Sequence, residues 1–104
     1  MLRRGLEDES PACRGSALIS LELLSRDHPG LVNDVRPRLH ELASHDDNQA
    51  VRRLAILCLS NGSPQRETVL ILSTLADDDE QDKELRAAAK KISETLRKRA
   101  AVRR

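Results

Sequence analysis

The sequence predicts an all-α fold in which five helices stack as an α-solenoid of about two and a half helical hairpins. Three observations lead to this prediction. Helix start signals recur along the 104-residue chain, no segment alternates polar and apolar residues as a strand does, and one short residue pattern occurs three times. Trp, Tyr and Phe are absent. The predicted core is therefore built from aliphatic side chains.

The expected helices span residues 11–25, 29–45, 49–60, 64–76 and 82–99. Three of them begin with a proline behind a capping residue: Ser10-Pro11, His28-Pro29 and Ser63-Pro64. A proline fits there because its missing N–H has no partner in the first helical turn. Asn48 and Asp82 are expected to cap the other two helices through their side chains. Asn61-Gly62 predicts a left-handed stop after the third helix.

A five-residue pattern, with arginine second and alanine fifth, occurs three times. It begins at Cys13, Val51 and Leu85, so the starts are 38 and 34 residues apart. A second pattern, LHELA at 39–43 and LSTLA at 72–76, recurs in the preceding helices. Periods of this length are typical of stacked helical repeats. We therefore expect a repeat domain over residues 10–99, after an N-terminal segment 1–9 and before a basic C-terminal tail 100–104.

The run LVNDVRPRLHELASHDDNQAVRRLAILCLS resembles a HEAT repeat, because an internal proline, an Asp-rich turn and a helix opening with Val-Arg follow one another. The matching positions in this run are Pro37, Val51, Arg52 and Ala55. The next hairpin matches at Leu85, Arg86 and Ala89, but Leu70 stands where the proline belongs. The resemblance covers residues 11–98. The short intervals favour the compact HEAT-like branch and leave armadillo-type packing open.

This resemblance implies a scaffold that binds proteins, and it implies structural roles for four residues. Arg14, Arg52 and Arg86 are expected to hold carboxylates and carbonyls of neighbouring turns, since the guanidinium is a forked donor. Pro37 removes one helical N–H and clashes with the carbonyl four residues back. The helix at 29–45 should therefore bend or break between residues 33 and 37.

The residues five and six places after the start of each pattern indicate how the stack ends. They are Leu18 and Ile19, then Ile56 and Leu57, then Lys90 and Lys91. The two lysines indicate a polar C-terminal cap, whereas the first helix is apolar and has no predicted partner helix. We therefore expect Leu18, Ile19 and Leu23 to bind a partner protein or a second copy of the chain, unless residues 1–9 fold over them.

Two other functions stay open. A HEAT-like protein can bind nucleic acid through a basic face, which here consists of Arg53, Lys90, Lys91, Arg97, Lys98 and Arg99. The formal net charge of +1, the acidic segment at 77–84 and the lack of aromatic residues argue against this function. The chain can also be an accessory domain of an enzyme.

No catalytic, metal or cofactor site is expected. His40 and His45 in HELASH stand five residues apart, so their side chains diverge by roughly 140° on a helix and cannot share an ion. Cys13 and Cys58 are expected to be small buried residues that do not pair. No apolar run has the ~20 residues that a membrane helix needs. We expect a soluble, cytoplasmic protein that is not an enzyme.

Overall fold

The computed structural model describes residues 2–102, and the side chains of residues 4–102. This part of the chain forms seven helices and no strand. They are α1 (Leu2–Leu6), α2 (Pro11–Ser25), α3 (Gly30–Asp34), α4 (Arg36–His45), α5 (Gln49–Leu59), α6 (Arg66–Asp77) and α7 (Lys83–Val102). The predicted all-α class is confirmed, but the predicted number of five helices is wrong. One extra helix forms at the N-terminus, and the expected helix 29–45 is divided in two.

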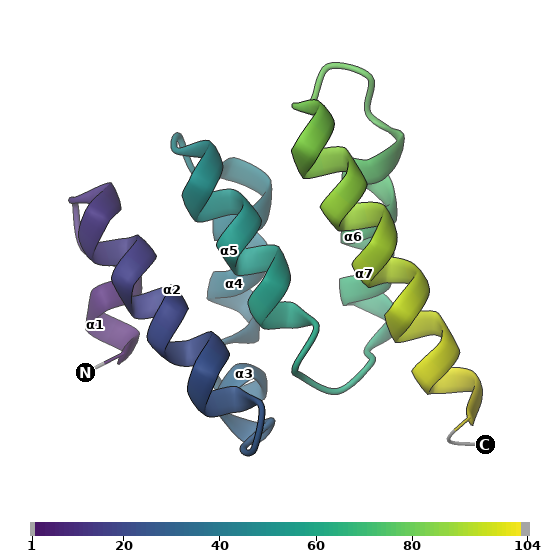
Figure 1. Ribbon diagram of the computed structural model, residues 1–104, viewed down its shortest axis with the longest axis horizontal. Coiled ribbons are helices and arrows are strands. Elements are labelled where there is room, and N and C mark those ends of the chain that lie inside the picture. Colours follow the sequence, from purple (N-terminus) through teal and green to yellow (C-terminus); the bar gives the residue numbers. More distant parts are fainter. Residues whose placement is uncertain (1, 103–104) are drawn as a thin grey trace.

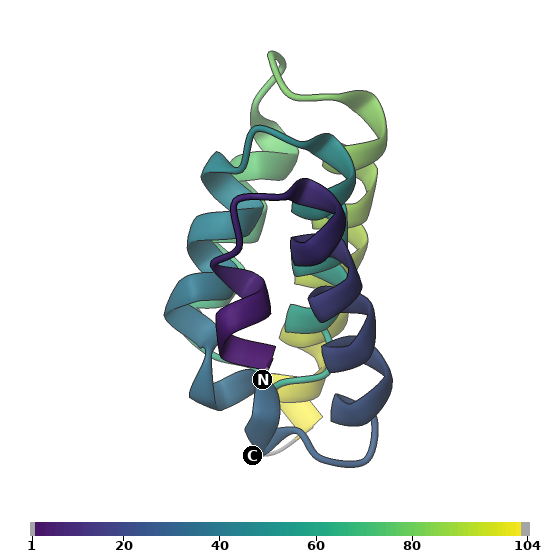
Figure 2. The same ribbon diagram turned by 90° about the vertical axis from the view of Figure 1, so that its left-hand side faces the viewer.

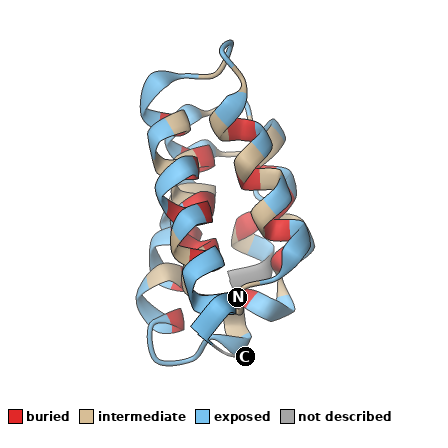
Figure 3. Ribbon diagram, turned by 90° about the vertical axis from the view of Figure 1, so that its right-hand side faces the viewer, coloured by how far each residue is buried: buried red, intermediate tan, exposed pale blue. Residues whose placement is uncertain are grey.

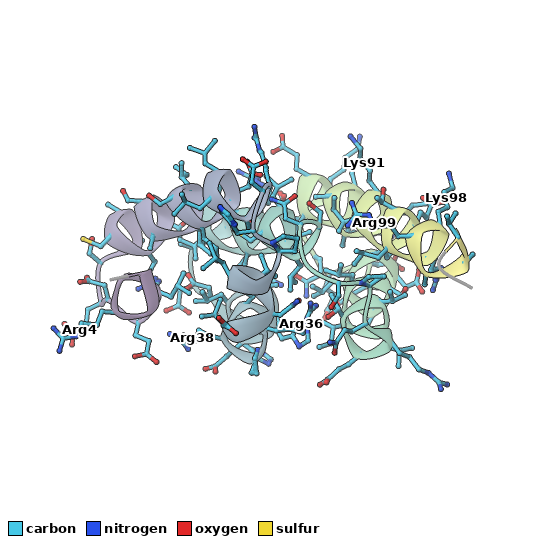
Figure 4. The ribbon with its side chains drawn as sticks, turned by 90° about the horizontal axis from the view of Figure 1, so that it is seen from below. Arg4, Arg36, Arg38, Lys91, Lys98 and Arg99 are labelled. Atoms are coloured by element: carbon cyan, nitrogen blue, oxygen red, sulfur yellow. The ribbon has the colours of Figure 1, made fainter. Side chains whose placement is uncertain are left out.

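The helices form three consecutive hairpins that lie side by side in two layers (Figure 1). One layer contains α2, α5 and α7, and we call it the upper layer because it lies above the other in Figure 4. The second layer contains α1, α4 and α6. Within the upper layer, α5 packs between α2 and α7. The molecule is thus a short α-solenoid, with each hairpin packed on the next one.

The first hairpin includes α1, which was not predicted. Figure 2 shows α1 lying against α2 at the N-terminal end of the stack. A side chain at Gly5 would come within 2.7 Å of the Cβ of Ala17, so glycine permits the close contact between the two helices. Leu6 is fully buried. A five-residue helix is not stable alone, so packing against α2 must supply its stability.

The break between α3 and α4 confirms the prediction made from Pro37. Val35 joins the two helices with φ −118° and ψ 16°, which is not helical. Pro37 lies in the first turn of α4. Because it has no N–H, it cannot continue the hydrogen-bond ladder of α3, and its ring would clash with the carbonyl of Asn33.

Three of the five predicted side-chain caps are present, at Ser10, Asn48 and Asp82. Each accepts a hydrogen bond from the backbone N–H three residues later, at 3.4 Å for Ser10, 3.1 Å for Asn48 and 3.1 Å for Asp82. Two of the three proline starts are displaced, however. Pro11 is the first residue of α2 as predicted, whereas α3 begins one residue after Pro29 and α6 begins two residues after Pro64. Neither of these two helices has a side-chain cap.

The left-handed stop predicted at Asn61-Gly62 is wrong, since none of the described residues has a positive φ. Gly62 is instead required by packing. A Cβ atom there would lie 2.6 Å from Cγ1 of Val32 and 2.8 Å from Nη2 of Arg36. The amide of Asn61 donates to the carbonyl of Glu22 at 3.0 Å and so links the end of α5 to α2.

The core is aliphatic and lies between the two layers. Figure 3 shows buried positions along the sides of the helices that face one another. Cys58 is buried as expected, but Cys13 is exposed, and both are free thiols. The reason lies in the repeat. Val51 in α5 is the repeat equivalent of Cys13 in α2. Val51 lies on the same side of α5 as Cys58, and this side faces α2, the helix of the preceding hairpin. Cys13 is exposed because no hairpin precedes α2.

Candidate protein-binding surface

The repeat register places equivalent residues at equivalent points of the upper layer. Five places after the start of each pattern, Leu18 and Ile56 are fully buried because each faces the next hairpin. Lys90, at the same place in α7, is exposed. Six places after each start, Ile19, Leu57 and Lys91 are all exposed. We call these three residues the transverse row, because they cross the three upper helices in order.

Aliphatic side chains are exposed in the first two helices of the upper layer. Ile19 is 51% exposed, Leu57 is 43% exposed and Leu23, one turn after Ile19, is 55% exposed. Leu54, one turn before Leu57, is half-buried, and its Cδ1 lies 3.7 Å from the Cβ position of Gly15. The contact of Leu54 with Gly15 shows that this apolar surface continues from α5 onto α2.

Hydrogen bonds fix the relative height of α2 and α5. The Cys58 thiol donates to the carbonyl of Leu18 at 3.2 Å. Ile19 and Leu57 are each one residue from this hydrogen bond, so their positions along the helix axes differ by only about 3 Å. Burial raises the pKa of the Cys58 thiol to about 12. The thiol therefore stays protonated at neutral pH and serves as a donor, not as a nucleophile.

The three residues expected to bind a partner, Leu18, Ile19 and Leu23, differ in exposure. Leu18 is fully buried, so it cannot contact a partner; this part of the expectation needs correction. Ile19 and Leu23 are exposed, but Ile19 does not lie on the N-terminal edge. It stands two residues from Ala17, which α1 covers, and is thus rotated by about 200° around the helix. Ile19, the equivalent Leu57, and Leu23, which is rotated from Ile19 by only about 40°, therefore lie on the outer face of the upper layer.

The six basic candidates do not share one surface. Arg53 forms ion pairs with Asp82 at 3.5 Å and Glu84 at 3.0 Å. Arg97 donates to Ser73 of α6 at 2.8 Å, and Lys90 also lies on that side, beside Asp77 and Glu94. Lys91 and Lys98 point outward from the upper layer (Figure 4), and Arg99 donates to the carbonyl of Ser60 at 2.5 Å. Nothing gathers these cations into one basic groove.

The three repeated arginines lie at the turns of the hairpins. Arg14 donates to the carbonyl of Asp8 at 2.8 Å and forms an ion pair with Asp46 of the next hairpin at 2.9 Å. Arg52 is buried and donates to the carbonyl of Ala43 at 2.9 Å. Arg86 makes the equivalent bond to Ala76 at 3.1 Å and reaches Asp79 at 3.2 Å. Their acceptors are thus both carbonyls and carboxylates.

A buried polar cluster between α4 and α6 was missed at the sequence level. Arg36 donates to Oγ1 of Thr68 at 2.9 Å, and Nε2 of His40 lies 2.7 Å from the same oxygen. Arg36 also donates to Asn33 and to the Ser63 carbonyl. Burial lowers the pKa of His40, and the Arg36 charge lowers it further, while the Glu67 charge opposes this. The spacing of Arg36 and His40, four residues apart on one helix, was the available signal.

His40 and His45 have separate surroundings. His40 is buried against Thr68, whereas His45 is exposed at the end of α4. Among the described residues, no group of three or more His, Cys, Asp and Glu side chains could hold a metal ion. Within the same part of the chain, every helix is too short or too polar to cross a membrane. Arg103 and Arg104 of the expected basic tail lie outside the described residues.

Comparison with known proteins identifies one family. The family model described as HEAT repeats matches residues 1–102. No curated protein and no solved structure matches the chain. The family match thus includes α1 and extends to the end of α7.

Proposed function

Because the chain belongs to the HEAT-repeat family, whose members generally mediate protein–protein interaction or scaffolding, we propose that it is a protein-binding module. The proposed binding surface is the outer face of the upper layer, centred on Ile19, Leu23 and Leu57. The family is typically non-enzymatic, and we propose no catalytic role for this chain. Its two free cysteines fit a reducing compartment such as the cytoplasm.

The observation that carries this proposal is the aliphatic surface that α2 and α5 share. Fully burying one large aliphatic side chain contributes about 1.5–3 kcal/mol. Ile19, Leu23 and Leu57 are already about half-buried, so covering what remains of each would contribute about 1 kcal/mol. The three together give about 3 kcal/mol, roughly a hundredfold in affinity. The occupant of this surface can be a partner protein or a second copy of the chain.

Binding of nucleic acid is supported less well. Arg53 is neutralised by two carboxylates, and Lys90 and Arg97 face a different side from Lys91 and Lys98. The absence of aromatic side chains removes the stacking contacts that single strands use. A role as an accessory domain of an enzyme would use the same protein-binding surface, so it is one form of the proposed function.

Substitution of the aliphatic surface tests the proposal. Ile19→Lys combined with Leu57→Lys should abolish co-purification of specific partners with the tagged protein, and should convert any self-associated species to monomer in light scattering. Leu70→Lys is the matched control, because Leu70 is 56% exposed and lies on α6 in the other layer. Circular dichroism verifies that all variants fold. Equal recovery of partners by both variants would refute the proposed surface.

A further inference from the structure

The transverse row is aliphatic at its α2 end and positively charged at its α7 end. It begins with Ile19 on α2, continues with Leu57 on α5 and ends with Lys91 on α7. Neighbouring packed helices have axes about 8–10 Å apart. The row therefore presents two apolar contacts and then a cation, at steps of about 10 Å, to a segment that crosses the three helices.

The charge at the α7 end of the row is not neutralised. From residue 90 to its end, α7 carries five cations and one carboxylate, Glu94. Within residues 4–102, neither Lys91 nor Lys98 takes part in an ion pair. In contrast, Arg26 on the α2 side is paired with Glu22 at 2.6 Å and Arg53 on α5 is paired with Glu84. The positive potential of this face is thus concentrated beside the third residue of the row.

We propose that the partner segment docked on the transverse row is an acidic amphipathic helix. Two of its aliphatic side chains cover Ile19 and Leu57, and a carboxylate two turns farther on meets Lys91. A helix suits the row because seven residues advance it by about 10 Å and return the side chain to nearly the same face. The partner sequence therefore has aliphatic residues at j and j+7 and Asp or Glu at j+14, in either chain direction. This inference rests on the proposed function.

A displayed peptide library provides the test. About 15 residues of helix span the row, so the probe is a phage library of random helical peptides of about this length, selected against the immobilised full chain. The same selection is made against Lys91→Glu. Lys90→Glu is the matched control, because Lys90 precedes Lys91 but faces the C-terminal edge, beside Asp77 and Glu94.

The wild-type chain and Lys90→Glu should enrich peptides that carry Leu or Ile and, at one end, Asp or Glu. Lys91→Glu should enrich Lys or Arg at that end instead. A selected acidic peptide should bind Lys91→Glu about 5- to 10-fold more weakly, since an attraction is replaced by a repulsion at an exposed site. Its binding should also be lost with Ile19→Ser and Leu57→Ser.

The other outcomes are distinguishable. If selected peptides depend on Ile19 and Leu57 but show no acidic preference, or if the preference survives in Lys91→Glu, the acidic partner is refuted while protein binding stands. If no selected peptide depends on Ile19 and Leu57, both this inference and the proposed function fail. If a labelled single-stranded DNA oligonucleotide binds in a Lys91-dependent way and displaces the peptides, the cation serves nucleic acid, and the acidic helix is again refuted.

Discussion

Replacing Thr68 by valine tests whether the buried polar cluster joins the second and third hairpins. Arg36 can only donate, so Oγ1 of Thr68 accepts from it, and the same hydroxyl forms a hydrogen bond with Nε2 of His40. Valine keeps the shape of threonine but removes both interactions, and it leaves two buried polar groups without their partner.

Leaving a buried donor or acceptor unsatisfied costs about 1–3 kcal/mol, and more when the group is charged. With two groups affected, Thr68→Val should lower the free energy of unfolding by about 2–6 kcal/mol. This is a large part of the roughly 5–15 kcal/mol that stabilises a typical domain. Urea unfolding followed by circular dichroism measures the change, with an unaltered slope if unfolding remains two-state.

Thr74→Val is the matched control on the same helix. Oγ1 of Thr74 is exposed and donates only to the carbonyl of Leu70, at 2.9 Å, so its loss should change the free energy of unfolding by less than about 0.5 kcal/mol. Equal effects of Thr68→Val and Thr74→Val would show that the buried cluster adds nothing to stability, and the physical account of the α4–α6 contact would be wrong.

Three further predictions concern stability and thiol chemistry. Burial lowers the pKa of His40 in the folded state. The stability that neutral His40 contributes is therefore fully present above the unfolded-state pKa of about 6.5, and it is lost as the pH falls towards the folded-state pKa. Urea unfolding from about pH 7.5 to about pH 5.5 should therefore show a smaller loss in His40→Gln than in the wild type, and identical losses would contradict the assignment. Gly62→Ala should destabilise by about 1–3 kcal/mol through overpacking, whereas Gly30→Ala, whose Cβ has nothing within 4 Å, should be neutral or stabilising in thermal unfolding; similar shifts in both would argue against the close contact. With a thiol reagent, Cys13 should react rapidly and Cys58 only after denaturation, because burial raises the pKa of the Cys58 thiol to about 12; rapid reaction of both would mean that the core opens readily.

The sequence predicted those features whose cause is local. A cap acts on the N–H three residues away, and Pro37 acts on the preceding turn, so Ser10, Asn48, Asp82 and the break at Val35 could be located without a structure. The family was also predictable, because the pattern of arginine and alanine recurs in each hairpin.

Features that depend on distant contacts could not be predicted in this way. The five residues of α1 form a helix only where α2 supports them, and Gly62 is needed because Val32 and Arg36 pass close to it. The candidate site shows the same limit. Ile19 and Leu23 were recognised as apolar, but their direction depends on which side of α2 faces α5. The partner of His40 is Thr68, 28 residues later in the chain.

The hairpin arrangement also bears on how the chain folds. Each helix packs mainly on helices of its own or the adjacent hairpin, so most native contacts join residues that are close in sequence. Proteins with such low contact order fold quickly, and a linear array can begin at any unit and grow outward. By the same reasoning, the end hairpins can open and close in hydrogen exchange while the central one stays folded. A ligand lying across α2, α5 and α7 would contact all three hairpins at once, so its binding would suppress the separate opening of the two end hairpins.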